Sequence, residues 1–301
     1  MKEGGDVKEE KLLIEAGDGV EIPLWLYLPD QPKSVIQFNP GTAAKMRFYQ
    51  PFLRFLAQRG FAVGQLGYRG SAEGPATNLK DCGFGYADYG LLDIPAGRAY
   101  LQQKFPGLPF LFVGHSGGGQ QLPFCENLKD VAGAHFFGVS TGYAPGMPLH
   151  YRLQSHFFFY LFGPLSIALK GYVAAKRFGI MEDLPPKAFN DWKDWCTSPD
   201  YFFDPRFYGT TVPEVDFGRI DFPIHHCHAS DETISTSENV RTFWRHWSSK
   251  AGITQQLLRP ADYSVKEIVH FGYFRRKMKD TLWVEVAERL ESWVENKKGR
   301  A

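Results

Sequence analysis

Apolar and polar positions along the chain follow two periods, and the changes between them mark predicted strands and helices. The predicted strands are short apolar runs at residues 34–39, 61–66, 110–113, 131–139, 222–229 and 254–259. Between them, apolar side chains recur at helical spacing, as at Phe48, Phe52 and Phe55 before a stop at Gly60. Strands that alternate with helices in this way predict an α/β fold with a mostly parallel sheet and right-handed crossovers.

The two ends of the chain add a hairpin and a final helix to this pattern. Residues 12–16 and 20–28 are predicted as paired strands around the turn at 17–19. Near the other end, apolar side chains at Leu282, Val286 and Leu290 fall on one side of an amphipathic helix. Helices on both sides of the sheet are therefore expected.

The alternation stops between residues 142 and 220, where aromatic side chains accumulate in "HFFFYLF", "DWKDWC" and "YFFDPRFYG". We expect residues 142–220 to form a helical cap, or lid, inserted into one core domain made of residues 1–141 and 221–301. The uncharged run at 157–169 has 13 residues and contains a glycine and a proline. A membrane-spanning helix needs about 20 apolar residues, so we expect no transmembrane segment.

Composition narrows the choice of partners. The 301 residues, 44% of them hydrophobic, are enough to bury a large core. With 34 basic and 33 acidic residues the chain lacks the basic excess of a nucleic-acid-binding protein, which favours a small neutral partner. The four cysteines are widely spaced, which predicts free thiols in a reducing compartment. The N-terminal segment is charged and lacks the apolar stretch of a secretion signal, which predicts a cytoplasmic location. The sequence does not decide the oligomeric state, and a homodimer remains open.

The stretch "FLFVGHSGGGQQLPF", residues 110–124, surrounds one serine with glycines directly after an apolar strand. A phosphate-binding loop would need a lysine where two glutamines follow, and the glycine spacing does not fit a dinucleotide-binding fingerprint. The spacing does fit a G-x-S-x-G nucleophile elbow, with Gly114, Ser116 and Gly118 at the defining positions. A glycine-rich helix start without chemistry is the alternative, but glycine there costs about 1 kcal/mol relative to alanine.

A serine nucleophile needs a base, and in this type of fold the acid and the histidine follow the serine along the chain. His270, in "EIVHFGYF" just before the final helix, is the predicted general base. An exposed histidine at a helix start is the alternative. His246 is better explained by packing. The strand at 225–228 holds three histidines and Cys227, but its alternation separates them and no second ligand cluster follows, so we expect no metal and no cofactor.

The acid is expected just beyond a strand end, between the serine and the histidine. "HASDETIS" supplies Asp231 there, with Glu232 beside it. We choose Asp231 because the shorter side chain is the usual partner on this turn, and keep Glu232 as the alternative. The structural alternative for Asp231 is an N-cap of the following helix. Asp204, inside the predicted cap, is a weaker candidate.

Attack on an ester carbonyl places negative charge on its oxygen, which two backbone N–H groups can stabilise. The first predicted donor is the amide of Gly117. The second is expected from "IQFNPGTAAK": Pro40 has no N–H, so we predict Thr42, with Ala43 as second choice. Gly41 would let the backbone approach the ligand. A simple Pro-Gly turn is the alternative.

These motifs together resemble the α/β-hydrolase superfamily, and more narrowly the bacterial predicted α/β-hydrolase group related to serine aminopeptidases and monoglyceride lipases. The matching stretches are "NPGTAAKMRFYQPFLRFLAQRGFAV", "GYRG", "FGYADYGLLDIPAG", "LFVGHSGGG", "DWKDWCTSPDYFFD", "ASDETIS" and "HFGYFR". The resemblance implies triad roles for Ser116, Asp231 and His270 and a cap from residue 142 to 220. It departs from many superfamily members in having Pro40 where they carry histidine.

The sequence therefore predicts a serine hydrolase that cleaves an ester or thioester through an acyl-enzyme. We expect Gly41, His115, Phe157 and Phe158 to contact the substrate, whose acyl or aryl group would be apolar. An aminopeptidase is one alternative, and it would need clustered carboxylates near the cap. The candidates for that role are Glu182, Asp183, Asp191 and Asp194. A catalytically silent ligand-binding protein of the same fold is the other alternative.

Overall fold

One eight-stranded sheet runs through the protein, in the order β1-β2-β4-β3-β5-β6-β7-β8. The computed structural model describes residues 6–179 and 181–299. Residues 1–5 and 300–301 of the expected core domain and residue 180 of the expected cap lie outside the described residues. The strands are β1 (Lys8–Glu15), β2 (Glu21–Leu28), β3 (Ser34–Asn39), β4 (Phe61–Leu66), β5 (Phe110–His115), β6 (Val131–Phe137), β7 (Ile224–Ala229) and β8 (Ile253–Leu258).

Strand pairing follows from the lengths of the connections. The short turn after β1 allows only an antiparallel partner, so β1 and β2 form the predicted hairpin, and β2 also pairs antiparallel with β4. From β4 onward to β8 all neighbouring strands are parallel. The central strands are buried along their whole length, which explains why they are continuous apolar runs. The predicted α/β fold with a mostly parallel sheet is confirmed.

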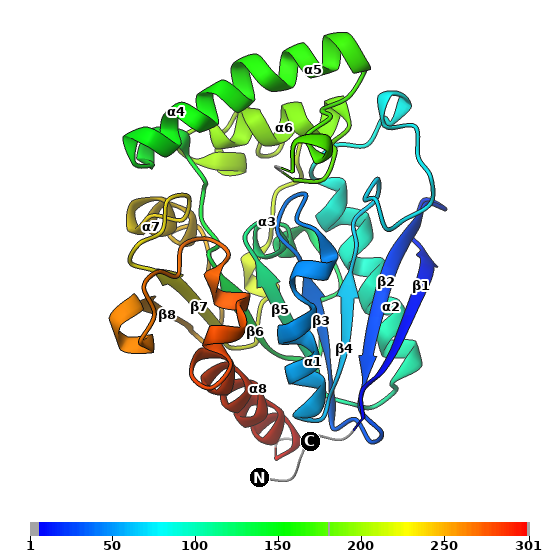
Figure 1. The fold of residues 1–301 in the computed structure, drawn as a ribbon. Coiled ribbons are helices and arrows are strands. Elements are labelled where there is room, and N and C mark those ends of the chain that lie inside the picture. Colours follow the sequence, from blue (N-terminus) through cyan, green and yellow to red (C-terminus); the bar gives the residue numbers. More distant parts are fainter. Residues whose placement is uncertain (1–5, 180, 300–301) are drawn as a thin grey trace.

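Helices cover both faces of this sheet (Figure 1). They are α1 (Gln50–Gln58), α2 (Ile94–Lys104), α3 (Gly117–Gln120), α4 (Leu149–Phe157), α5 (Gly163–Lys170), α6 (Pro186–Cys196), α7 (Ser237–Trp244) and α8 (Leu282–Lys298). Helices α1 and α8 pack together on one face, where the rings of Phe52 and Trp283 lie 5.5 Å apart. Side chains of α2 and α7 belong to the core on the opposite face.

Helices α4, α5 and α6 interrupt the alternation between β6 and β7. Figure 1 shows them stacked over the end of the sheet where α3 begins, with α4 and α5 forming the outermost layer. A π-helical turn, Phe158–Phe162, joins α4 to α5 into one continuous helical segment. In the described ranges 6–179 and 181–299, no helix combines the length and the hydropathy that crossing a bilayer requires.

Candidate active site

Ser116 occupies the sharp turn between β5 and α3. Its φ of 48° and ψ of −119° lie in a region that non-glycine residues rarely adopt, and such strain is maintained only where the surroundings impose it. Here the Ser116 N–H donates to the carbonyl of Phe137 at 2.9 Å, and the Ser116 carbonyl accepts from Gly119 and Gln120. The backbone of the turn is thus tied to β6 on one side and to α3 on the other.

The glycines around Ser116 are required by close approach of neighbouring atoms. A Cβ at Gly118 would overlap the carbonyl oxygen of Asn39, and one at Gly117 would overlap the side chain of Thr42. At Gly114 the added atom would lie 2.9 Å from the ring of Phe136. The steric demand inferred from the G-x-S-x-G spacing is therefore visible in the packing.

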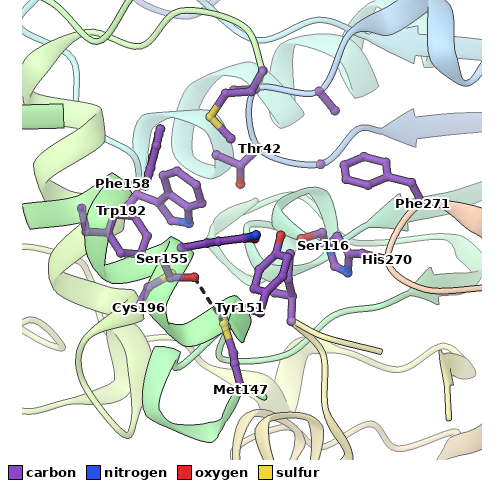
Figure 2. Close-up of a pocket in the computed structure, with 18 of the residues that line it drawn as sticks. Thr42, Ser116, Met147, Tyr151, Ser155, Phe158, Trp192, Cys196, His270 and Phe271 are labelled. Atoms are coloured by element: carbon purple, nitrogen blue, oxygen red, sulfur yellow. Dashed lines mark hydrogen bonds between the residues drawn. The ribbon is translucent and has the colours of Figure 1, made fainter. Parts of the chain in front are cut away.

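His270 lies in the loop before α8 and is fixed by a buried carboxylate. The Nδ1 atom of His270 lies 3.0 Å from Oε1 and 3.2 Å from Oε2 of Glu232. Because an ionised carboxylate can only accept, Nδ1 carries a proton, and in the neutral ring Nε2 then has the lone pair. Figure 2 shows Ser116 and His270 at the same end of a cavity that both residues line.

The choice of Asp231 as the partner of His270 is wrong. Asp231 instead accepts the backbone N–H groups of Ile268 and Val269, at 2.9 and 3.1 Å. Val269 has a φ of 47°, so Asp231 holds a strained backbone segment directly before His270. The turn after β7 therefore directs Glu232 toward the imidazole of His270 and Asp231 toward the backbone of the loop before it.

Three further contacts hold Glu232 in place. The Tyr273 hydroxyl donates to Oε1 at 2.6 Å, and the backbone N–H groups of Ile234 and Ser235 donate to Oε2, each at 3.4 Å. Burial by itself raises the pKa of Glu232, but His270 and these donors outweigh burial and lower the pKa below its ordinary value. The carboxylate therefore stays charged beside the imidazole.

A second hydrogen-bonded chain connects three loops of the site through His115. The Nε2 of His115 lies 2.8 Å from the carbonyl oxygen of His270, so this nitrogen carries the proton and donates. Its Nδ1 must then accept, and it does so from the Tyr49 hydroxyl at 2.8 Å. The same hydroxyl accepts the Gly41 N–H at 3.1 Å. Tyr49, which sequence analysis missed, thus links the Gly41 loop, the elbow and the His270 loop.

The ionisation states of His115 and Tyr49 agree with the hydrogen bonds that they form. Burial, reinforced by the neighbouring His270, lowers the pKa of His115 well below its ordinary value, so its ring stays neutral. Burial raises the pKa of Tyr49, so its hydroxyl keeps the proton that it donates. His115 was expected to contact substrate; both of its ring nitrogens are instead occupied by protein atoms, although the residue lines the cavity.

The loop after β3 brings Thr42 against the elbow. A Cβ at Gly117 would lie 3.1 Å from the Thr42 backbone nitrogen, so there is no room for a side chain between Gly117 and the Thr42 backbone. The Thr42 side chain shares a hydrogen bond with the Tyr86 hydroxyl, and Ala43 has a φ of 50°. Gly41 and Thr42 line the same cavity as Ser116.

This cavity has a volume of about 820 Å³ and extends from the elbow into the cap. The predicted substrate contacts Phe157 and Phe158 both belong to its wall. Figure 2 shows Phe158 and Trp192 at the end opposite Ser116, and the Tyr151 ring from α4 beside the serine. Tyr151 and Trp192 were not singled out from the sequence, because their positions depend on how the cap helices fold over the core.

The other catalytic or metal-binding candidates considered from the sequence do not line this cavity. His246 stacks on Phe203, with ring centroids 4.1 Å apart, and Asp204 binds Ser198 and Arg206. On β7, His225 bonds to side chains of β8. Within residues 6–179 and 181–299, no group of three or more histidine, cysteine, aspartate or glutamate side chains is arranged to hold a metal ion.

Solved structures similar to this chain include esterases and a lipase. An esterase of Pyrococcus furiosus is 14% identical, with 96% of this chain and 93% of that chain covered and a TM-score of 0.56. A thermostable carboxyl esterase of Bacillus coagulans is 17% identical, with 96% and 100% covered and a TM-score of 0.55. A lipase in an open form is 15% identical, with 96% and 99% covered and a TM-score of 0.59. The chain matches no protein-family model and no curated protein sequence.

The sheet, the elbow after β5 and these similarities define the α/β-hydrolase fold. The similarities extend over nearly the whole chain in each case. The narrower relation to serine aminopeptidases and monoglyceride lipases stays a prediction from the sequence.

Proposed function

We propose that the chain is a serine hydrolase that cleaves a carboxylic ester or thioester through an acyl-enzyme. The observation that carries the proposal is the hydrogen-bonded pair of Glu232 and His270. The imidazole of this pair lines the same cavity as Ser116, which occupies the strained elbow. A carboxylate-oriented imidazole beside a hydroxyl is the arrangement that activates serine as a nucleophile.

In the first half-reaction, Nε2 of His270 takes the proton of Ser116 as its oxygen attacks the substrate carbonyl. The tetrahedral oxyanion would receive hydrogen bonds from the N–H groups of Gly117 and Thr42, two residues that lie so close together that a side chain at Gly117 would overlap Thr42. When the bond to the leaving group breaks, protonated His270 returns the proton to the departing oxygen or sulfur. Glu232 stabilises the imidazolium throughout and remains ionised.

In the second half-reaction, water replaces the alcohol or thiol. His270 takes a proton from water as the water oxygen attacks the acyl carbonyl, and then returns this proton to Ser116 as the acyl bond breaks. The products are a carboxylic acid and the free enzyme. The apolar cavity wall supports an apolar acyl or aryl group as the part of the substrate that binds there.

The aminopeptidase alternative receives less support from the cap carboxylates. Asp191 accepts from the Tyr86 backbone and pairs with Lys187, while Glu182 pairs with Lys176. None of the four candidates named above is among the described residues that line the cavity. A free amine of a bound peptide would therefore lack a carboxylate partner, which favours esters over peptides.

The test is hydrolysis of p-nitrophenyl esters of graded chain length, with peptide amides assayed in parallel. Ser116→Ala should lower kcat for the esters by at least about 10³-fold. Ser155→Ala is the matched control, because Ser155 lines the same cavity and lies on α4. It should keep turnover and labelling by a fluorophosphonate, both of which Ser116→Ala should lose. Equal turnover by wild type and Ser116→Ala, or an unlabelled serine in folded wild type, contradicts the proposal.

A further inference from the structure

The outer side of the cap carries an unusual concentration of exposed apolar side chains. Among the described residues, twelve large apolar side chains are exposed, and eight of them lie between residues 149 and 178. The eight are Leu149, Leu153, Phe157, Tyr160, Leu161, Leu165, Leu169 and Phe178. Contiguous apolar surface of this kind marks a contact with another phase or partner, whereas single exposed apolar residues do not.

Six of these side chains form a ladder with a strict four-residue spacing, from Leu149 to Leu169 along α4, the π-helical turn and α5. In a regular α-helix each step of four residues overshoots a full turn by about 40°, so a long ladder would wind around the helix. A π-helical turn takes one additional residue into a single turn and offsets part of this drift. The ladder is thereby kept on the exposed side.

The other side of the same helical segment faces inward and is packed. Phe159 contacts Phe189 and Trp192 of α6, with ring centroids 6.1 and 5.2 Å apart. Figure 1 shows α6 between α4–α5 and the core, so the outer layer has protein on one side only. The ladder is therefore not part of the buried core.

The charged side chains within the segment that carries the ladder are all basic. From residue 131 to residue 181 the sequence contains no aspartate or glutamate, although the whole chain has 33 of them. The same stretch contains Arg152, Lys170, Lys176 and Arg177, of which Lys176 pairs with Glu182 at 3.4 Å. A second copy of the chain docked on this side would present the same positive charges and be repelled. An anionic lipid surface would be attracted.

The ladder is continuous with the cavity wall. Leu153 and Phe157 are both exposed ladder residues and cavity-lining residues. An apolar path therefore leads from the outer side of the cap into the cavity that ends at Ser116. A helix with an apolar stripe, aromatic side chains and cationic neighbours is of the type that lies in the plane of a lipid interface.

We propose that the outer side of α4 and α5 lies on an anionic lipid surface, from which the cavity takes an acyl ester of a lipid as substrate. The identity of the substrate rests on the proposed hydrolase function, whereas the docking does not. The lipid interface would cover the ladder, and Leu153 and Phe157 would mark the entrance for the acyl chain.

The test is co-sedimentation of the full chain carrying Ser116→Ala, so that lipid is not consumed. Vesicles of phosphatidylglycerol and phosphatidylcholine in equal parts are compared with vesicles of phosphatidylcholine alone. The test variant adds Leu161→Ser, Leu165→Ser and Leu169→Ser, which change the ladder outside the cavity wall. The matched control adds Leu13→Ser and Leu257→Ser, at exposed leucines of β1 and β8. Thermal unfolding checks that every variant is folded.

We expect binding to the anionic vesicles that weakens about tenfold or more in the ladder variant and is unchanged in the control. Raising the salt from about 0.05 M to about 0.5 M should weaken binding further, because it screens the cationic residues. With Ser116 restored, the ladder variant should hydrolyse a soluble short-chain ester at the wild-type rate. Vesicle binding without any ester turnover would count against the hydrolase proposal alone.

Three outcomes overturn the docking proposal. The first is equal sedimentation of the ladder variant and its parent, and the second is equally strong binding to both kinds of vesicle. The third is a dimer that the ladder substitutions dissociate, together with no vesicle binding, which would assign the apolar side to a second copy of the chain.

Discussion

The sheet edge around Ser116 and the cap above it line one cavity, yet different physical constraints shape the two regions. At the sheet edge, polar atoms are joined in directed hydrogen bonds, such as His270 Nδ1 to Glu232 and His115 Nε2 to the His270 carbonyl. In the cap, aromatic rings contact one another at varied angles. Phe158 stacks on Phe162 at 5.7 Å but meets Trp192 edge-on at 6.0 Å.

The comparison separates two kinds of tolerance to substitution. A hydrogen-bonded chain fails when one atom is removed, because its partners are left buried and unpaired. An apolar wall can be rebuilt by other apolar side chains of similar volume. We therefore expect substitutions at the sheet edge to change the rate of the chemical step. Substitutions in the cap should change which ester binds.

The largest expected effect distinguishes the two adjacent carboxylates. Glu232→Gln keeps the shape of the side chain but loses the charge that orients and stabilises protonated His270. We expect kcat to fall by about 10³- to 10⁴-fold with little change in KM. Asp231→Asn should weaken the contacts to Ile268 and Val269, lowering the free energy of unfolding by about 1–2 kcal/mol and kcat by less than about tenfold. Steady-state kinetics and urea unfolding of both variants provide the measurement.

The same pair gives a pH-dependent control. The pKa of Glu232 is lower in the folded chain than its ordinary value, so its contribution to stability is present above that ordinary value and is lost as the pH falls through the folded pKa. The stability difference between wild type and Glu232→Gln should therefore shrink below about pH 4. A larger loss of kcat in Asp231→Asn than in Glu232→Gln would reverse the assignment.

The contrast between the two carboxylates also shows what the sequence was able to predict. The elbow was predictable because its glycines and its serine lie within a few consecutive residues after an apolar strand, so the whole signal is local in sequence. The atoms that exclude larger side chains there come from distant residues, such as Asn39 and Phe136. The choice between Asp231 and Glu232 depends on how the turn after β7 meets a loop near residue 269, far along the chain. Two neighbouring carboxylates carry no sequence signal for that direction.

Other contacts between residues far apart in the sequence could not be predicted for the same reason. Tyr49, directly before α1, meets His115 at the end of β5 only because the fold brings these two segments together, and neither flanking sequence marks the contact. In the cap, the aromatic composition predicted an insertion with helices. It did not predict which rings face inward, because the π-helical turn at Phe158–Phe162 changes the helical period midway.

An intermediate effect on kcat is expected when the hydrogen bonds of the Tyr49 hydroxyl are removed. Tyr49→Phe removes the hydroxyl and leaves the Gly41 N–H and His115 Nδ1 without their partner. We expect the free energy of unfolding to fall by about 1–3 kcal/mol. Because Tyr49 positions other groups and does not touch substrate, kcat should fall about tenfold with KM nearly unchanged.

Tyr27→Phe is the matched control for this positioning role. The Tyr27 hydroxyl is also buried and donates to Gln65 at 3.0 Å, but it lies outside the cavity wall. Its removal should cost a similar amount of stability and leave kcat unchanged. If both variants lose kcat in proportion to their loss of stability, Tyr49 has only a structural role.

The smallest expected effect concerns the cap and is confined to one class of substrate. Phe158→Ala removes a ring from the part of the cavity wall opposite Ser116. A long acyl chain therefore loses apolar contact, whereas a short acyl chain bound at Ser116 does not extend as far as Phe158. We expect KM for a p-nitrophenyl octanoate to rise about five- to tenfold, with kcat and all constants for the acetate nearly unchanged.

Phe178→Ala provides the comparison within the cap, because Phe178 is an exposed ring that packs on the outer side of the cavity-lining Phe162 and does not itself line the cavity. It should leave the kinetics of both esters unchanged. Equal changes for octanoate and acetate in Phe158→Ala would show that this ring acts on the sheet edge through packing. The two regions would then be coupled, and the division between an edge that sets the reaction and a cap that sets the substrate would fail.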